Sequence, residues 1–357
     1  MNKRGDVLQA IQTKMMLFVM LLAGLMLAAP AWAGVASTPM QWSKGDFSEE
    51  GQAIEHITLR ASNSAGQDTF VRFSVANAGF KRGQLEVTFR QEAGGGTFFG
   101  RQTFARGDYS TTSDRLGITA GKNSLTSQGG TMTAQFAIDG MTATVTVTSW
   151  MSPFSVVDKG GAGYIWRELM APVARVVVHC TDASGRVFDT TANGYAVHEA
   201  STAPAHRIYD RSVQMFRFGA TQLVIDYIVM PSERGSRPLG FVVAVGKGKA
   251  FAGEVVKEVR QDEHVDSAND YRVPYQVQVL GKRGAGRVAF ALTGEKQVAR
   301  EDDLADLSWA ARKAVGSLLH PVTYTVKGTA QIELQSTPDE AATVLDATCR
   351  YKYAQTR

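Results

Sequence analysis

Residues 131–148, TMTAQFAIDGMTATVTVT, contain the clearest fold signal in this sequence. Over residues 142–148 polar and apolar side chains alternate, which is the period of a β-strand with one face in water. Asp139 and Gly140 separate this segment from a second strand-like segment, Thr131–Ile138. That dipeptide suits a tight turn because both central positions need a positive φ. The stretch therefore predicts an antiparallel β-hairpin.

Similar strand-like segments recur along the chain and are separated by glycine-rich or charged turns. They cover residues 53–60, 69–76, 84–90, 97–105, 174–180, 222–230, 239–245, 271–280 and 321–334. Short strands at fairly even spacing favour sandwiches or barrels over βαβ units. One segment differs, because apolar residues at helical intervals and acidic residues at its start predict an α-helix over residues 301–319. We therefore expect a mostly β protein with one helix.

Length and composition favour two folded domains. The chain has 357 residues, of which 44% are hydrophobic and 20% are charged, so it has enough apolar side chains for real cores. The strands divide into comparable halves at residues 35–183 and 184–357, with a turn sequence at 182–185 between them. Two cysteines are too few for a disulfide scaffold or a zinc site built from thiolates.

The N-terminus has the pattern of a targeting signal. A basic start is followed by an apolar run over residues 15–29, which Pro30 ends, and the small-x-small sequence AWA follows at 31–33. This pattern predicts a secretory signal peptide at residues 1–33, cleaved after Ala33. The alternative is an uncleaved membrane anchor, since a spanning helix needs only slightly more apolar length, about 20 residues. We expect export, most simply to a bacterial periplasm.

The net charge and the two cysteines limit which partners and which cross-links are expected for the exported chain. The signal segment contains three basic residues and one acidic residue, so its removal lowers the net charge from +4 to +2. No basic stripe is evident, so we expect no nucleic-acid partner. In an oxidising compartment Cys180 and Cys349 are candidates for a disulfide, and two separate buried thiols are the alternative.

The densest polar cluster surrounds His198. His198 and Glu199 open like a zinc-protease motif, but the second histidine of that motif is missing, and we expect neither a metal nor a cofactor. Histidine titrates near neutral pH, so His198 is a candidate acid/base residue if a polar partner lies close. The candidate partners are Glu199, His206, Asp210 and Asp226. The alternative is a histidine that only holds a barrel mouth together.

A second cluster combines large aromatic residues with a glycine-rich loop. Trp150, Tyr164 and Trp166 flank this loop and are candidates for the lid of an apolar pocket, since ligand sites are mostly apolar with a few polar groups. Ordinary core aromatics are the alternative. Tyr195 and His198 complete the candidate ligand-binding set.

Several segments together resemble a known family through their order and spacing. They lie at residues 40–42, 106–150, 163–179, 194–218, 279–281 and 320–324. In these segments the chain resembles the survival-factor family of tandem lipocalin-like proteins, whose members act as soluble ceramide carriers. It is more distantly similar to the carotenoid-hydratase-like branch of the same fold. The resemblance covers nearly all of the chain after residue 33.

The resemblance implies two lipocalin-like (calycin) antiparallel β-barrels in tandem and a ceramide-like or sphingolipid-like two-chain lipid as ligand. A barrel of about eight strands can hold one apolar ligand. We therefore expect a carrier for lipid transport, with transient contact to a membrane or membrane protein. The first alternative is a hydratase or isomerase acting on an isoprenoid lipid, with His198 and Asp226 as the acid/base pair. The second is a non-catalytic envelope scaffold with solid cores.

Overall fold

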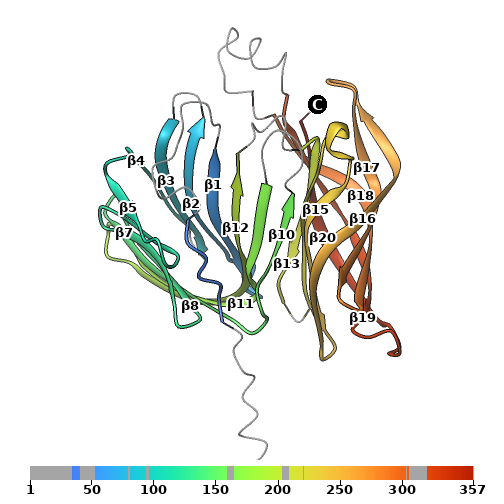
Figure 1. The fold of residues 1–357 in the computed structure, drawn as a ribbon, viewed down its shortest axis with the longest axis horizontal. Helices are drawn as coiled ribbons and strands as arrows, with labels where there is room; N and C mark the ends of the chain where they lie inside the picture. Colours follow the sequence, from blue (N-terminus) through green and yellow to red (C-terminus); the bar gives the residue numbers. More distant parts are fainter. Residues whose placement is uncertain are drawn as a thin grey trace, which may run out of the picture.

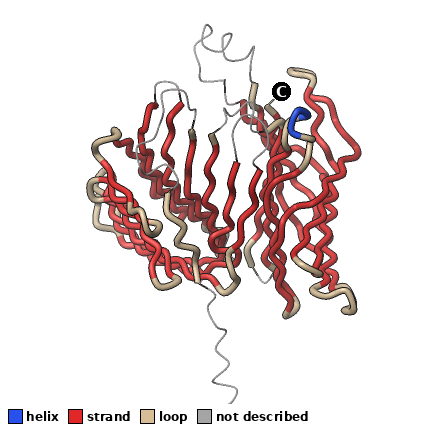
Figure 2. The backbone as a smooth tube through the Cα atoms, in the orientation of Figure 1, coloured by secondary structure: helices blue, strands red, loops and turns tan. Residues whose placement is uncertain are grey.

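The computed structural model describes residues 34–40, 53–78, 81–93, 96–158, 165–202, 209–219, 221–302, 304 and 320–356. Strands make up most of these residues, and the one helical element among them is the short 3₁₀ turn η1 (Ser232–Arg234), as Figure 2 shows. The predicted β class is therefore confirmed. In this part of the chain no helix has the length and apolar character that crossing a membrane requires.

Twelve antiparallel strands form the first sheet, which curls around its own core at the left of Figure 1. Its order is β4-β3-β2-β1-β12-β11-β9-β8-β7-β6-β5, and β10 pairs with β11 beside this path. The strands are β1 (Ile54–Ser62), β2 (Asp68–Ala78), β3 (Lys81–Ala93), β4 (Gly96–Phe104), β5 (Tyr109–Thr111), β6 (Gly117–Ala120), β7 (Asn123–Gln128), β8 (Thr131–Ile138), β9 (Met141–Ser149), β10 (Phe154–Asp158), β11 (Ile165–Thr181) and β12 (Val187–Ser201). The sheet is thus larger than the expected eight-stranded barrel and remains open between β4 and β5.

Eight antiparallel strands close into a barrel in the second half of the chain, at the right of Figure 1. They are β13 (Arg211–Arg217), β14 (Gln222–Val229), β15 (Pro238–Gly246), β16 (Lys249–Asp266), β17 (Tyr271–Arg283), β18 (Gly286–Asp302), β19 (Val322–Gln335) and β20 (Thr343–Gln355). Each strand pairs with the next, and β20 pairs back to β13. The two units confirm the expected tandem lipocalin-like architecture.

The hairpin predicted from residues 131–148 is present. β8 and β9 pair through Ile138 and Met141, and the two turn residues have positive φ values, 52° at Asp139 and 78° at Gly140. The dipeptide therefore forms the tight turn that its sequence predicts.

The structure corrects two predictions about how the chain is organised. β12 pairs with β1 and β11, so the division between the sheets lies between Ser201 and Arg211 and not at residues 183/184. The turn at 182–185 instead joins β11 to β12. The predicted helix does not begin at residue 301, because β18 continues to Asp302. Residues 305–319 and 1–33 lie outside the described residues.

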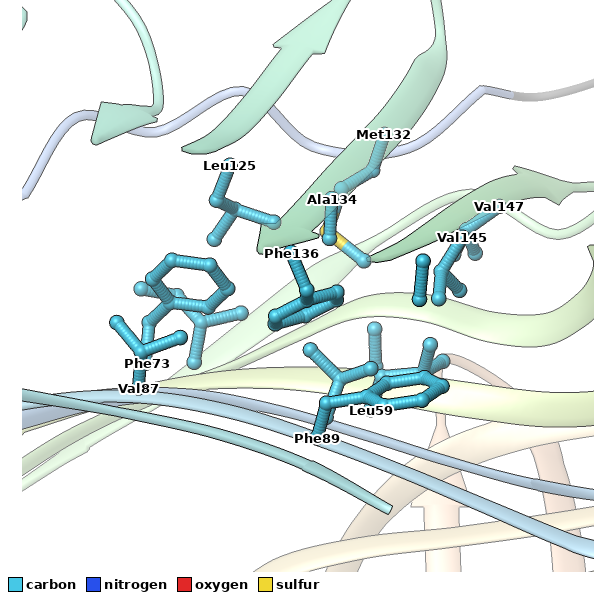
Figure 3. Packing of buried hydrophobic residues seen from close by; sticks show 14 of the residues in the cluster. Leu59, Phe73, Val87, Phe89, Leu125, Met132, Ala134, Phe136, Val145 and Val147 are labelled. Carbon is cyan, nitrogen blue, oxygen red and sulfur yellow. The ribbon is translucent and has the colours of Figure 1, made fainter. Parts of the chain in front are cut away.

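Each unit has its own apolar core. In the first sheet Phe136 lies between Phe73 and Phe89, with ring centroids 5.7 Å and 5.0 Å away, as Figure 3 shows. The interior of the second barrel is occupied by large side chains, including the fully buried Tyr351 and Phe290. This filling is typical of small barrels.

The two cysteines belong to different cores. Cys180 lies in the core of the first sheet and Cys349 in that of the second barrel, and both are free thiols. The candidate disulfide is therefore not formed, and the alternative of two buried thiols holds. Burial raises the pKa of both thiols to about 11.

A third apolar cluster joins the two units. It contains Ile165, Leu169 and Val197 from the first sheet and Val224 and Phe241 from the second barrel. These side chains lie on the outer faces of their sheets, because their strand neighbours point into the cores. The cluster therefore fixes the outer face of β11 and β12 against β14 and β15.

We expect Phe73→Ala to lower the free energy of unfolding by about 3–5 kcal/mol, because it leaves a cavity in a close-packed core. Denaturant unfolding measures this change. Phe99→Ala is the matched control: its side chain is 58% exposed, and the expected loss is below about 0.5 kcal/mol. Equal losses in the two variants contradict the position of Phe73 in the core.

Candidate functional site: an inter-sheet pocket

A cavity of about 360 Å³ lies between the first sheet and the second barrel. Its floor is the outer face of β2, β1, β12 and β11, and residues of β13 and β14 form its roof. Strand alternation explains the floor: His56, Thr58 and Arg60 line the cavity, while Ile57 and Leu59 between them are buried in the core of the first sheet. We call this cavity the inter-sheet pocket.

Three ionisable side chains form a row across the floor. The β-ladders place His56 opposite Glu199, and Glu199 opposite Arg167. His56 Nε2 lies 2.6 Å from Glu199 Oε2, and Arg167 Nε donates to Glu199 Oε1. Burial opposes ionisation of Glu199, but the charges of Arg167 and His56 outweigh it and hold its pKa well below the usual range. Glu199 is therefore ionised at neutral pH, and both of its carboxylate oxygens already have partners.

Arg167 also connects the floor to the roof. Its Nη2 donates to Asp226 Oδ1 at 2.8 Å, and its Nη1 donates to the backbone carbonyl of Leu239 at 3.1 Å. The side chain is only 3% exposed. Burial opposes its charge, but Glu199 and Asp226 more than compensate and raise the pKa of Arg167 above its ordinary value. One buried cation thus binds a carboxylate from each unit.

Tyr195 extends this network. Its hydroxyl donates to Asp226 Oδ2 at 3.1 Å, from the floor strand β12 to the roof strand β14. Burial and the neighbouring Asp226 carboxylate raise the pKa of Tyr195 well above 10.0, so the phenol keeps its proton. Two of the residues proposed from the sequence, Tyr195 and Asp226, therefore meet at the pocket.

His198 lies on the other side of the same strand. Glu199 faces the pocket, whereas His198 is fully buried and its Nε2 lies 2.6 Å from Glu55 Oε1. The structure therefore pairs His198 with a glutamate that sequence reasoning did not consider, in place of Glu199, Asp210 or Asp226. The fourth proposed partner, His206, lies outside the described residues.

The proposed aromatic lid is not assembled at the pocket. Trp166 packs edge-to-face on the His198 ring, with centroids 4.8 Å apart. Trp150 follows β9 and is 44% exposed, and neither tryptophan lines the pocket. Tyr164 lies outside the described residues.

Sequence reasoning missed the charged residues of the floor. Each of these residues is an isolated ionisable side chain within a strand, and together they form no sequence motif. They are His56, Arg60, Arg72 and Arg167. The alternation of residues 54–62 was a usable signal for a shared face. It did not reveal which sheet that face meets, because this depends on pairing between strands far apart in the chain.

Comparison with solved structures finds proteins of similar overall fold. The crystal structure of CghA with Sch210972 gives a TM-score of 0.53 at 9% identity, over 92% of this chain and 95% of that one. CghA alone gives 0.52 at 9% identity, over 85% and 88%. The chain shares its fold with CghA. At this identity the likeness to CghA establishes the fold alone.

Kievitone hydratase from Nectria haematococca gives a TM-score of 0.43 at 9% identity, over 91% of this chain and 98% of that one. This TM-score is too low to support an argument. No family model matches the sequence, and neither does any curated protein.

Arg167→Gln should lower the free energy of unfolding by about 3–5 kcal/mol, because it removes the shared cation from two largely buried carboxylates. Denaturant unfolding at neutral pH measures the loss. The control Arg186→Gln breaks an exposed pair with Asp182, which solvent screens, so the expected loss is much smaller. A similar small loss in both variants contradicts the structural role of Arg167.

The lowered pKa of Glu199 gives a second prediction, about pH dependence. Its folded-state pKa lies below the 4.5 of an unperturbed glutamate, so its contribution to stability is present above that value and is lost as pH falls. The free energy of unfolding should therefore fall more steeply from about pH 5 to about pH 3 in the wild type than in Glu199→Gln. Parallel pH profiles contradict it.

Proposed function

We propose that this protein binds a small amphipathic molecule in the inter-sheet pocket. The cavity volume lies within the range of about 300–1,000 Å³ that is typical of small-molecule sites. Such sites combine an apolar lining with a few fixed polar groups. The apolar part of this lining comes from Ile54, Phe70, Ile165, Val197 and Ile228.

The observation that carries this proposal is the network that holds the polar groups of the pocket in place. Hydrogen bonds across the two units hold four side chains in place: those of Arg167, Glu199, Asp226 and Tyr195. A site whose side chains are already ordered loses less conformational entropy when it binds a ligand. The interior of the second barrel, in contrast, is occupied by its own side chains.

The volume of the pocket favours a compact or single-chain ligand. A cavity of about 360 Å³ lies at the lower end of the range for small-molecule sites, so it holds only part of a two-chain lipid. The crystal structure of CghA with Sch210972 supports the view that this fold accommodates a bound compound. A ceramide-like or sphingolipid-like cargo, which the family resemblance implies, remains the alternative identity of the ligand.

The proposed biological role is transport of this ligand through the periplasm after removal of residues 1–33. Each methylene group that leaves water for an apolar site contributes about 0.8 kcal/mol. An apolar molecule therefore crosses an aqueous space slowly without a carrier. The role is supported by the signal-like N-terminus together with a pocket between the first sheet and the second barrel.

Ligand identification tests the binding function. Residues 34–357 are purified from the producing cell, extracted with solvent and analysed by mass spectrometry. We expect one stoichiometric amphipathic compound, and Ser212→Trp should reduce its occupancy at least tenfold because the indole fills the pocket from its roof. Ser110→Trp, at an exposed position of β5, is the matched control and should retain the compound. Equal occupancy in both variants contradicts the pocket, and a sphingolipid identifies the two-chain alternative.

A second candidate function is acid/base catalysis on an isoprenoid lipid, as a hydratase or isomerase. The specific observation in its favour lies on the inner face of the first sheet. His198 Nδ1 and Glu168 Oε2 are buried and have no hydrogen-bond partner within the described part of the chain, and the two residues are directly opposite in the ladder of β11 and β12. Buried polar atoms without partners are rare, and a catalytic role is one explanation for them.

The placement of His198 between Glu55 and Glu168 suits an isomerase. The Glu55 carboxylate stabilises the His198 imidazolium that forms when Nδ1 removes a proton from carbon. In the proposed step the carboxyl group of Glu168, whose pKa is raised by burial against a hydrogen bond from Thr38, donates a proton at the other end of a shifting double bond. One proton leaves the substrate and one enters it, and the charge balances.

Deuterium exchange tests this second function. The extracted compound is incubated with the protein in D₂O, and mass spectrometry follows deuterium incorporation at carbon. His198→Gln should abolish incorporation, whereas the control His179→Gln, which removes an exposed histidine–aspartate pair of equal length, should not. Incorporation that persists in His198→Gln, or is absent from the wild type, rejects the catalytic function.

A further inference from the structure

We propose that the ligand of the inter-sheet pocket is an anionic amphiphile whose acidic head, a carboxylate or a similar group, binds between Arg60 and Arg72. This inference rests on the binding function proposed above and specifies the chemical class of the ligand. It is carried by the charges that line the pocket and by the way those charges are already paired.

Arg60 and Arg72 are neighbours on the pocket floor. In the ladder of β1 and β2, Thr58 is opposite Arg72 and Arg60 is opposite Phe70. The two arginines therefore occupy diagonal positions on one face of adjacent strands, within reach of a single group. Both line the inter-sheet pocket.

Neither arginine forms an ion pair with another described residue. The Nε atom of Arg72 is buried and has no hydrogen-bond partner among the described residues. The Arg60 guanidinium lies over the rings of Phe70 and Phe216, 4.9 Å from each centroid. These rings hold the guanidinium in place without forming an ion pair with it.

The carboxylates of the pocket are already engaged. Glu199 binds Arg167 and His56, and Asp226 binds Arg167 and Tyr195. The lining thus contains three arginines and two carboxylates, an excess of positive charge even with His56 neutral.

Burial makes this excess unfavourable. It lowers the pKa of Arg72, against the opposing attraction of Glu199 and Glu86. A partly buried charge without a close counterion is costly, and a bound anion offsets that cost. The apolar lining described above then takes the rest of the molecule, with Phe70 and Ile54 on the same two strands as the arginines.

Calorimetric titration with decanoate and methyl decanoate tests the inference, because the two probes share one chain and differ in charge. The wild type should bind decanoate at least tenfold more tightly, since a charge-assisted hydrogen bond contributes about 1.5–3 kcal/mol and each 1.4 kcal/mol is a factor of ten. Arg72→Gln and Arg60→Gln should each reduce this preference severalfold. Arg287→Gln, an exposed arginine on β18 outside the pocket, should retain it.

The outcomes separate this inference from the function on which it rests. Equal binding of the ester and the acid to the wild type overturns the anionic head and leaves the binding function in place. Absence of binding by both probes, together with extraction of no compound from the purified chain, overturns both. If Arg72→Gln lowers the thermal unfolding midpoint, Arg60→Gln alone decides, and an unchanged preference for decanoate in that variant rejects the inference.

Discussion

The arrangement of the two units depends on buried ion pairs between them, above all those of Arg167. Its guanidinium binds Glu199 on the first sheet and Asp226 on the second barrel, and it is almost inaccessible to solvent. Apolar contacts such as those of Val197 with its neighbours in the third cluster tolerate small displacements, whereas a buried ion pair requires defined geometry. The ion pairs therefore set how the two sheets meet, and the shape of the inter-sheet pocket follows from that meeting.

Strand alternation gives β12 two different roles. Tyr195 and Glu199 lie on its outer face and line the pocket, while His198 lies on its inner face beside Glu55 and Glu168. A shift of one residue in the register exchanges the two faces, which places the imidazole in the pocket and the carboxylate in the core of the first sheet. The close pairing of β12 with both β1 and β11 fixes the register against such a shift.

The fold class could be predicted from local sequence patterns, whereas the residues of the candidate site could be predicted only in part. Alternation over residues 131–148 and the Asp139-Gly140 turn are local properties, so the β-hairpin was predictable. The boundary at 183/184 failed because the turn at 182–185 has the same composition whether it joins two domains or two strands of one sheet. Tyr195 and Asp226 were proposed, but their contact and the role of Arg167 depend on sheet order, which local patterns do not encode.

The solid interior of the second barrel explains why the candidate pocket lies outside it. Side chains such as Tyr351 and Phe290 occupy the volume that a ligand fills in a hollow barrel, so this unit contributes an outer wall and the Asp226 carboxylate. That carboxylate is neutralised by Arg167, whereas Arg60 and Arg72 on the facing wall form no ion pair with another described residue. Recognition of the proposed ligand thus depends on both units together, since one supplies the two arginines and the other forms the opposite wall of the pocket.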